Sequence, residues 1–316
     1  MVSKTNEQAL EASIEKYLTG TCLEELAAIC DSAAQVSVGP NHDYQLGRAA
    51  DFNARYALDS RCLWQFLEAS QGDELARLKQ RYDDWDLRIL ERFDRLAKKY
   101  GVLHLLKRGL AIDDVHLNLM YPAPLASSSA RVKQQFAANI FSSTRQVRYS
   151  LSNPLEEIDL VLFINGLPFA TLELKNPWTG QNARYHGQKQ YKQDRDTGQP
   201  LLQFGRCLVH MAVDTDEVYM TTKLAGAATF FLPFNKGHNH GAGNPPNPAG
   251  HKSAYRGRRF SAVKAWPISS STLCAWMAAA KRHWPSARCS SRVITSWMWC
   301  AVWWPMPVSR GGVSVT

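Results

Sequence analysis

The chain has 316 residues, with 37 Lys and Arg, 28 Asp and Glu and a hydrophobic fraction of 45%. This length supports one large domain or two ordinary ones with a sizeable core, and the composition excludes a wholly disordered chain. No apolar run reaches the roughly 18 residues of a membrane-spanning helix, and the acidic N-terminal stretch excludes a secretory signal. The seven scattered cysteines are typical of reduced thiols, so we expect a cytoplasmic protein.

The N-terminal part is predicted to be helical. Residues 5–32 should form one or two helices, because apolar residues recur there at helical spacing. Residues 33–58 are predicted to be a polar connection, and residues 59–100 a strongly helical stretch that ends at Gly101. Charged residues interleave along that stretch, which favours a solvated helical face over a nucleic-acid site.

From about residue 102 the pattern changes to mixed α/β. Short alternating apolar runs indicate strands, and a Gly/Pro/Asn-rich segment at 237–252 indicates a loop. The predicted elements are a strand over 115–121, a helix over 129–141 capped by Ser127 or Ser128, a strand over 145–151, a hairpin within 156–176, a helix over 183–196 and a hairpin of 206–214 with 217–224.

The segment EIDLVLFINGLPFATLELKN is the most informative, because it predicts two strands around Asn165-Gly166. A two-residue turn would mix polar and apolar side chains on both faces of the hairpin. A three-residue turn that also includes Leu167 makes one face wholly apolar, as a buried sheet requires. That register sets Asp159 opposite Glu173, and Lys175 lies two residues on, pointing to the same side.

Two carboxylates and an ammonium group should therefore converge at one end of the hairpin. Opposed carboxylates repel each other, so the arrangement favours a divalent cation between Asp159 and Glu173. Carboxylate oxygens suit Mg²⁺, which can polarise a phosphoryl group and lower the pKa of a bound water. Lys175 would steady that water and offset charge on the phosphate. The alternative is an exposed Glu-x-Lys ion pair worth less than about 1 kcal/mol.

Several stretches of the sequence carry a family resemblance. They are GVLHLLKRGLAIDDVHLNLMYPAPLA, NIFSSTRQVRYSL, IDLVLFINGLPFATLELKNPWTGQ, LLQFGRCLVHMAVDTDEVYMTTKLAG and FFLPFNKG. Through them, residues 1 to about 255 closely resemble the N-terminal part of the restriction (R) subunit of type I restriction-modification enzymes. The resemblance implies a PD-(D/E)xK restriction-endonuclease-like α/β fold, a mixed sheet flanked by helices with a helical N-terminal region.

The resemblance also implies functions for single residues. The family's metal-binding acids fall on Asp159 and Glu173, and its catalytic lysine falls on Lys175. A further family glutamate on the first helix, implied as a metal ligand, corresponds to Glu11, with Glu7 and Glu15 as alternatives.

A Gln-x-x-x-Tyr motif follows the lysine strand in related subunits. Its tyrosine falls on Tyr191, which is thereby implied as a catalytic residue. Gly187 stands where the glutamine is expected, with Gln188 and Gln190 as near substitutes.

The implied activity is that of a type I site-specific deoxyribonuclease, which cleaves double-stranded DNA with Mg²⁺. Family subunits assemble with methyltransferase (M) and specificity (S) subunits and continue into an ATP-driven motor. The sequence has no Gly-x4-Gly-Lys-Ser/Thr motif, so we expect ATP to serve only a missing motor. The expected domains are a helical region 1–112, a nuclease core 113–236, a loop 237–255 and a tail 256–316.

The tail has an unusual composition. Residues 218–316 carry 12 Lys and Arg and no acid, and seven of the ten tryptophans fall within 266–316. Because Trp has the single codon TGG, its abundance can reflect a shifted reading frame. One codon choice for residues 265–277, regrouped after an added A, encodes an ordinary amphipathic helix. We therefore expect an out-of-frame, disordered tail after about Tyr255, and the alternative is a genuine Trp-rich basic interaction tail.

Two functions compete with the nuclease hypothesis. The chain could be a non-catalytic docking module that anchors the R subunit to the M and S subunits, for which the helical region 1–112 is suited. It could also be an inactive, truncated product of the R subunit.

Overall fold

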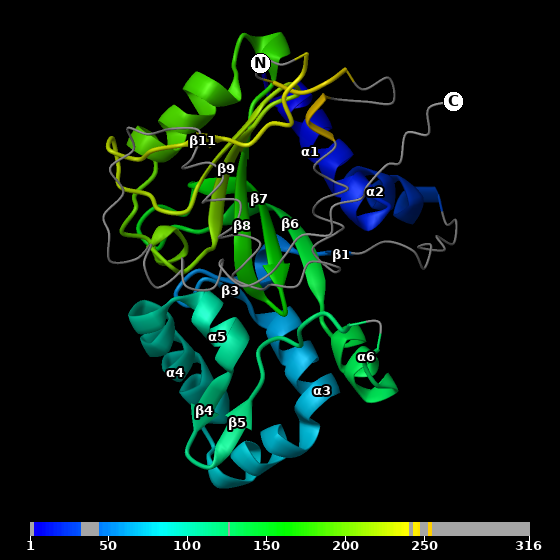
Figure 1. The fold of residues 1–316 in the computed structure, drawn as a ribbon, viewed down its shortest axis with the longest axis vertical. Helices are drawn as coiled ribbons and strands as arrows, with labels where there is room; N and C mark the ends of the chain where they lie inside the picture. Colours follow the sequence, from blue (N-terminus) through cyan, green and yellow to red (C-terminus); the bar gives the residue numbers. More distant parts are fainter. Residues whose placement is uncertain (1–2, 33–43, 126, 240–242, 247–251, 255–316) are drawn as a thin grey trace, which may run out of the picture. The chain divides into compact units, whose positions relative to one another are not determined.

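The structure, a computed structural model, describes residues 3–32, 44–125, 127–239, 243–246 and 252–254, all within one compact unit (Figure 1). Two helices begin the chain, as predicted: α1 (Ser3–Thr19) and α2 (Leu23–Ser32). Helix α1 ends at Gly20, whose φ of 83° suits glycine. Its buried residues Leu10 and Leu18 attach it to the rest of the fold.

A mixed sheet is the centre of the fold, and in the described part of the chain it has seven strands in the order β1-β6-β7-β8-β9-β10-β11. The pairs β1–β6 and β8–β9 are parallel, and the other neighbours are antiparallel. The strands are β1 (Gln45–Leu46), β6 (Phe141–Arg148), β7 (Glu157–Ile164), β8 (Leu167–Leu174), β9 (Val209–Val213), β10 (Val218–Thr221) and β11 (Leu232–Pro233). The predicted α/β class, with a mixed sheet flanked by helices, is confirmed.

The β7–β8 hairpin has the register predicted for its outer part, but its turn is different. Leu160 pairs with Leu172, which is the register of the three-residue turn. Ile164 pairs with Leu167, however, so the turn contains only Asn165-Gly166, and both residues have positive φ as a two-residue hairpin turn requires. A register shift within the ladder, a β-bulge, supplies the extra residue. The prediction of a three-residue turn was therefore wrong, because apolar alternation cannot distinguish a longer turn from a bulge.

The turn of this hairpin packs on the beginning of a helical region. The backbone N–H of Asp59 donates to the carbonyl of Gly166 at 2.8 Å, and a Cβ atom at Gly166 would lie 2.2 Å from the Asp59 carbonyl oxygen. The Asp59 side chain also caps α3, because its Oδ1 accepts from the backbone N–H of Cys62 at 2.8 Å. A glycine is thus required where the sheet meets α3.

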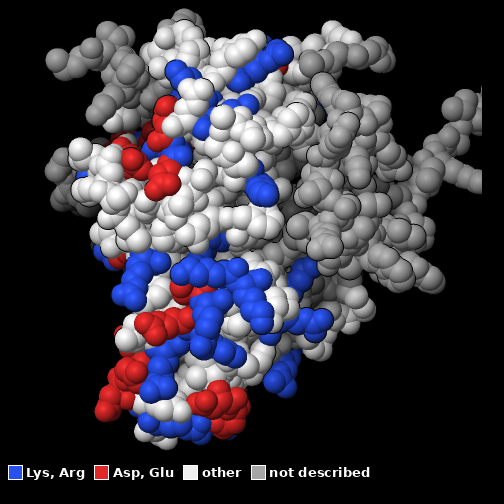
Figure 2. Space-filling view, turned by 90° about the vertical axis from the view of Figure 1, so that its left-hand side faces the viewer, with Lys and Arg blue, Asp and Glu red and all other residues white. Residues whose placement is uncertain are grey.

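The predicted helical stretch 59–100 is two helices, α3 (Ser60–Arg81) and α4 (Trp85–Tyr100), and α4 ends at Gly101 as expected. In the lower part of Figure 2, acidic side chains lie among basic ones, in keeping with the interleaved sequence. The other elements within residues 49–117 are η1 (Ala49–Asp51), β2 (Phe52–Asn53), β3 (Leu58–Asp59), α5 (Val102–Arg108), β4 (Leu110–Ile112) and β5 (Val115–Leu117).

After β8 the chain makes a crossover and returns parallel to it as β9. The helix predicted at 183–196 is present as two π-helical segments, η3 (Ala183–Gly187) and η4 (Gln190–Asp194). The predicted hairpin around Thr215-Asp216 is present as the β9–β10 pair. Short 3₁₀ segments complete the fold: η2 (Pro177–Thr179), η5 (Pro200–Leu202) and η6 (Lys252–Ala254).

Four local predictions differ from the structure. The strand predicted over 145–151 begins and ends earlier, as β6. Strand β1 lies inside the predicted connection 33–58, and two residues are too few for a periodic signal. The strand predicted over 115–121 is only β5, which pairs with β4 outside the main sheet. Helix α6 (Ala130–Ala137) is capped by Ser129 rather than Ser127 or Ser128, and the Ser128 hydroxyl instead accepts from the backbone N–H of Leu125 at 2.9 Å. The predicted domain division stays a prediction, and residues 256–316 lie outside the described residues.

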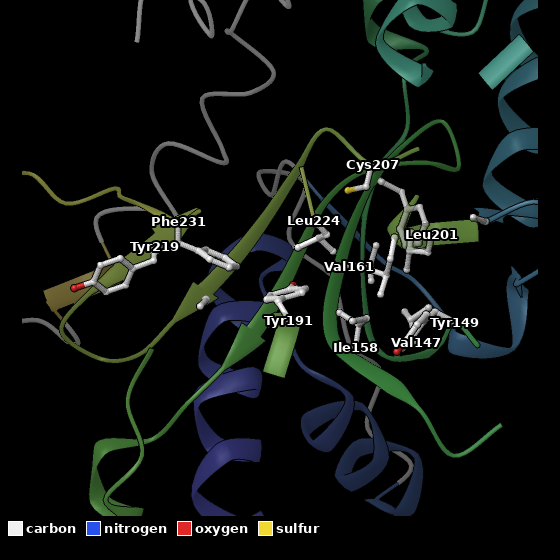
Figure 3. Close-up of a cluster of buried hydrophobic side chains, with 14 of the residues drawn as sticks. Val147, Tyr149, Ile158, Val161, Tyr191, Leu201, Cys207, Tyr219, Leu224 and Phe231 are labelled. Atoms are coloured by element: carbon white, nitrogen blue, oxygen red, sulfur yellow. The ribbon is translucent and has the colours of Figure 1, made fainter. Parts of the chain in front are cut away.

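Both faces of the sheet are buried at its centre, where every residue of β8 is in the interior. On one face, Tyr191 of η4 packs among side chains of β7 and of the segments after β8 (Figure 3). On the other, α1 lies along β1, β6 and β8. The main apolar cluster includes Val147, Tyr149, Ile158, Val161, Phe163, Leu201, Leu202, Cys207, Ala212 and Phe231. Polar groups on β7 and β8 are therefore held in a rigid, dry setting.

Candidate active site

Asp159 and Glu173 are brought together by the β7–β8 ladder, as the register predicted. The last recorded pair on that side is Leu160 with Leu172, and Asp159 and Glu173 occupy the next positions. The Asp159 carboxylate reaches across, because its Oδ2 accepts a hydrogen bond from the backbone N–H of Leu174 at 2.6 Å. Asp159 is half-buried whereas Glu173 is fully buried, so the pair lies where the sheet begins to open to solvent.

The two carboxylate oxygens of Glu173 have different surroundings. Oε1 accepts a hydrogen bond from Arg195 Nε at 2.9 Å, and Arg195 Nη2 lies 2.7 Å from the same oxygen in an ion pair. Oε2 is buried without a hydrogen-bond partner in the described part of the chain. Burial, and next the charge of Asp159, raise the pKa of Glu173 to about 8, although Arg195 and Lys175 act in the opposite direction. A carboxylate in this position favours an added positive charge.

Lys175 follows directly after β8 and is also buried. Its Nζ donates to the carbonyl of Leu174 at 2.9 Å, and its backbone N–H donates to the carbonyl of Val213 on β9 at 2.8 Å. The ammonium group is thus held at the same end of the sheet as Asp159 and Glu173. The three predicted residues of the hairpin therefore lie together.

Tyr191 lies behind this site, in the apolar cluster of Figure 3. Its hydroxyl and the Nδ1 atom of His210 each lie 2.8 Å from Oγ1 of Thr171, which is on β8 two residues before Glu173. Burial, and next the charge of Glu173, raise the pKa of Tyr191 well above its ordinary value. Burial lowers the pKa of His210 to about 3, so the ring is neutral. Tyr191 borders the site through Thr171.

The missing glutamine of the tyrosine motif has a steric explanation. A Cβ atom at Gly187 would lie 2.9 Å from Cβ of Ala212 and 3.5 Å from Cγ of Lys175, so this backbone leaves no room for a long side chain. Of the two near substitutes, Gln188 lies 3.5 Å from the Lys192 ammonium. Gln190 has a buried Oε1 without a hydrogen-bond partner among the described residues.

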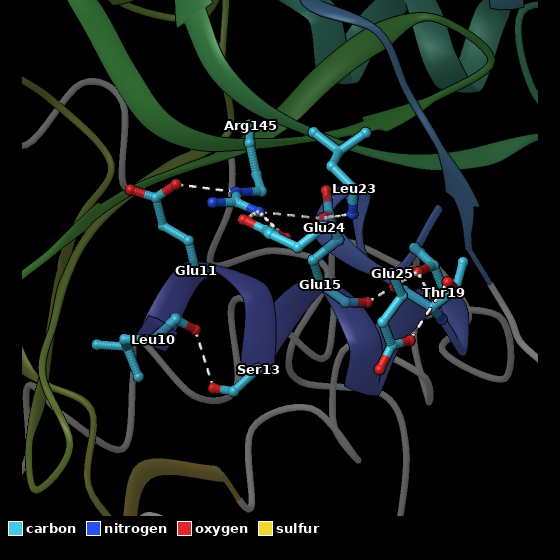
Figure 4. Close-up of polar contacts among 10 residues, drawn as sticks. Leu10, Glu11, Ser13, Glu15, Thr19, Leu23, Glu24, Glu25 and Arg145 are labelled. Atoms are coloured by element: carbon cyan, nitrogen blue, oxygen red, sulfur yellow. Dashed lines mark hydrogen bonds and ion pairs between the residues drawn. The ribbon is translucent and has the colours of Figure 1, made fainter. Parts of the chain in front are cut away.

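Glu11 is buried in a different cluster, centred on Arg145 of β6 (Figure 4). Arg145 Nε donates to Glu11 Oε2 at 2.9 Å, and Arg145 Nη1 lies 3.4 Å from Glu15 and 2.8 Å from Glu24. Burial raises the pKa of Glu15. The side chain of Glu7, the other alternative, lies outside the described residues. Among the predicted acids of α1, the two described ones therefore share one arginine.

The arginine cluster and the paired carboxylates project from opposite faces of the sheet. Arg145 pairs with Leu160, and Leu160 pairs with Leu172, so these three side chains share a face. Glu173 is adjacent to Leu172 on β8 and therefore points to the other face. The structure does not group Glu11 with Asp159 and Glu173.

Metal-ligand chemistry is consistent with the hairpin carboxylates alone. No group of three or more His, Cys, Asp or Glu in the described part of the chain could hold a metal ion. Asp159 and Glu173 still offer hard oxygen donors, and a divalent cation would satisfy Oε2 of Glu173, which has no partner in the part of the chain that the structure describes. Mg²⁺ commonly uses one or two carboxylates and keeps several waters, so the residues present fit such an ion.

Sequence reasoning missed two residues that shape these clusters, Arg145 and Arg195. Arg195 stands four residues after Tyr191 in the predicted helix 183–196, a spacing that brings side chains to one helix face. That spacing was a usable signal for a residue near the site. Arg145 lies on a central strand, where an arginine is buried only if it is paired, and this was the corresponding signal.

Comparison with protein families gives one match that covers more than half of the chain. The family described as type I restriction enzyme R protein N terminus matches residues 55–229. No curated protein and no solved structure matches the chain. In the described part, no helix combines the length and apolar character needed to cross a bilayer. The matched range contains Asp159, Glu173 and Lys175, and the chain belongs to the family of type I restriction enzyme R protein N termini.

Proposed function

We propose that this chain carries the PD-(D/E)xK endonuclease core of a type I restriction R subunit and hydrolyses double-stranded DNA with Mg²⁺. The observation that carries the proposal is Oε2 of Glu173, which is buried and has no hydrogen-bond partner among the described residues, beside Asp159 and followed by Lys175. Without a cation, these paired acids would be a costly arrangement in a sheet interior. Membership of the restriction family supports DNA as the substrate.

The three residues divide two functions between them in this proposal. Asp159 and Glu173 would hold Mg²⁺, which when bound supplies Lewis acidity toward a phosphodiester oxygen and acidifies a coordinated water. Lys175, held by the Leu174 carbonyl at 2.9 Å, would orient the attacking water and neutralise charge that develops on the phosphate. The hydrogen bond from Leu174 N–H to Asp159 keeps the first carboxylate close to the second strand.

Tyr191 and Glu11 have weaker geometric support than the hairpin residues. Tyr191 contacts Thr171 rather than an acid of the site, so we propose that it supports β8 from behind. Glu11 as a third metal ligand stays a prediction, and its bond to Arg145 favours a structural function. The Glu11→Gln variant separates a structural function from a metal-binding one. If Glu11 is structural, the substitution lowers thermal stability and leaves the stabilisation by divalent cations unchanged. If Glu11 is a metal ligand, the substitution weakens that stabilisation.

A DNA-binding surface on α4 is a further part of the proposal, and it departs from the sequence expectation that residues 59–100 form only a solvated helical face. A hollow of about 740 Å³ lies along α4, on a part of the surface other than the paired carboxylates. Five of its lining residues are Lys or Arg and three are Asp or Glu, and Figure 2 shows Lys and Arg side chains gathered on this part of the molecule. The cationic residues of the hollow are Arg55, Arg88, Arg92, Arg95 and Lys98. Two of them form salt bridges within α4 or at its start, Arg88 with Asp84 and Lys98 with Asp94.

The hollow extends from α4 toward the loops near the site. Leu151 and Pro200 line it as well. Leu151 lies two residues after Tyr149, over whose ring the Arg195 guanidinium stands at 5.5 Å, and Arg195 contacts Glu173. A phosphodiester backbone held on Arg92 and Arg95 could therefore continue toward the carboxylates. Such contacts are independent of base sequence, which agrees with a domain whose target choice belongs to a separate S subunit.

A docking function has one specific observation in its favour. Trp64 of α3 and Trp85 of α4 are half-buried and stand edge to face with ring centroids 5.2 Å apart, and Lys79 Nζ lies 4.6 Å from the Trp85 ring. Accessible tryptophans are frequent anchors of protein interfaces. We propose this pair as a contact for the M and S subunits. Pull-down with those subunits should fail for a Trp64→Ala, Trp85→Ala double variant and succeed for Lys175→Met.

Plasmid nicking tests the main proposal. The full chain is incubated with supercoiled DNA and Mg²⁺, as wild type and as Glu173→Ala and Lys175→Met, with the exposed neighbour Lys189→Met as the matched control. We expect Glu173→Ala to be inactive, Lys175→Met to lose roughly 100- to 1,000-fold in rate, and the control to retain wild-type activity. Equal nicking by wild type and Glu173→Ala would refute the site.

A further inference from the structure

Arg195 has an unusual contact with the candidate metal ligand Glu173. It follows η4 and points back to β8, where Nε donates to Oε1 of Glu173 at 2.9 Å and Nη2 lies 2.7 Å from the same oxygen. Arg–carboxylate pairs are frequently two parallel bonds to two oxygens. Here both guanidinium nitrogens contact one carboxylate oxygen, Oε1. The other oxygen, Oε2, is buried without a hydrogen-bond partner among the described residues.

Arg195 is itself held in place by the Tyr149 ring as well as by Glu173. Its guanidinium stands 5.5 Å from the centroid of the Tyr149 ring, and the Tyr149 hydroxyl donates to Glu156 at 2.8 Å. The Arg195 side chain is only 8% exposed. An arginine fixed in this way restricts the side-chain rotation of Glu173 and determines which oxygen is available.

We propose that Arg195 is a positioning residue of the nuclease site: it fixes Oε1 of Glu173 so that Oε2 is the oxygen presented to the divalent cation beside Asp159. This inference rests on the proposed nuclease function and adds a residue to it. Arg195 contacts neither DNA nor the cation in this arrangement and acts only through Glu173. The two acids then approach the ion with one defined oxygen from Glu173, which lowers the conformational cost of binding.

A purely structural ion pair is the competing explanation, since Arg195 also connects the crossover to β8. The two explanations differ in whether both carboxylate oxygens of Glu173 should have hydrogen-bond partners. A structural pair is best when both carboxylate oxygens are satisfied, because a buried unmade hydrogen bond is expensive. The orphaned Oε2 therefore favours positioning for a ligand. Partners that orient metal ligands in this way typically affect metal affinity by 10- to 100-fold.

The test compares Arg195→Gln and Arg195→Lys with Arg184→Gln, an exposed arginine of the same crossover. Thermal unfolding of the full chain is followed during a Ca²⁺ titration, which needs no cleavage, and plasmid nicking is measured against Mg²⁺ concentration. We expect Arg195→Gln to move the Ca²⁺ midpoint roughly 10- to 100-fold higher and to raise the Mg²⁺ requirement more than it lowers the maximal rate. Arg195→Lys should fall between Arg195→Gln and wild type, and Arg184→Gln should match wild type.

The outcomes separate this inference from the proposed function. If Arg195→Gln unfolds at a lower temperature but keeps the wild-type Ca²⁺ midpoint, Arg195 is only a structural partner and the inference is overturned. If that variant does not fold, Arg195→Lys decides, because a wild-type midpoint there has the same meaning. If Glu173→Ala responds to Ca²⁺ and nicks DNA like wild type, the nuclease site itself is wrong, whatever Arg195 does.

Discussion

The carboxylate of Asp159 accepts a hydrogen bond at 2.6 Å from the backbone N–H of Leu174, the residue between Glu173 and Lys175. This bond joins the two strands at the point where the ladder ends. It fixes Asp159 close to both other residues of the candidate site through backbone rather than through a flexible side chain. The geometry of the site thus depends on a contact that a charge-neutral amide could also make.

Asp159→Asn therefore separates geometry from charge. The amide oxygen of asparagine can accept from Leu174 N–H, so the variant should fold with a thermal midpoint close to that of wild type. It lacks the negative charge needed to hold a divalent cation, so plasmid nicking should fall to background, and Ca²⁺ should no longer stabilise the chain. Thermal unfolding with and without Ca²⁺ checks both parts. A variant that nicks DNA at the wild-type rate would remove Asp159 from the site.

Cation binding should depend on pH because the pKa of Glu173 is raised to about 8 by burial and by Asp159. Below pH 8 a proton competes with the cation for this carboxylate. The apparent Ca²⁺ affinity should therefore rise roughly tenfold per pH unit up to about pH 8 and then level off. Calorimetric titration at several pH values measures it. A flat profile between pH 6 and 8 would show that Glu173 is ionised throughout.

Without metal, the free energy of unfolding should fall as pH rises, whereas the Ca²⁺ affinity rises. The folded-state pKa of Glu173 lies above its ordinary value of 4.5, so its contribution is fully present below pH 4.5 and is lost as pH rises through 8. Glu173→Gln cannot ionise, and its free energy of unfolding should decline less over this window. Urea unfolding of both proteins in EDTA, at pH 5 and pH 8, tests this sign. Parallel declines would contradict it.

The sequence allowed the hairpin site to be predicted because β7 and β8 are neighbours in sequence and alternation sets their register. The bulge and the two-residue turn were not predictable, since both solutions give the same outer register at Leu160 and Leu172. The function of Glu11 depends on Arg145, 134 residues away in the chain, and helical periodicity carries no information on such a partner. Steric crowding at Gly187 likewise arises only when the crossover returns to β9.

Arg145 should matter for stability rather than for catalysis. Arg145→Met would leave Glu11 and Glu15 buried without their shared cation, and breaking such buried pairs costs roughly 3 kcal/mol. The pair with Glu24 adds less, because that side chain is 54% exposed. Urea unfolding should show the loss, and the exposed Arg131→Met on α6 serves as control. Because protonation relieves unpaired acids, the loss should be smaller at pH 5 than at pH 8. An equal loss at both pH values would point to lost packing instead.

The α4 hollow should determine DNA affinity without affecting base preference. Arg92 and Arg95 lie three residues apart on one face of α4 and line the hollow together. Arg92→Glu with Arg95→Glu should weaken binding of several unrelated duplexes by a similar factor and reduce the salt dependence by about one unit of slope for each lost phosphate contact. Fluorescence anisotropy in Ca²⁺, with the exposed Arg77→Glu of α3 as control, measures binding without cleavage. Equal weakening by Arg77→Glu would indicate a general charge effect, and unchanged affinity in the double variant would place the DNA elsewhere on the molecule.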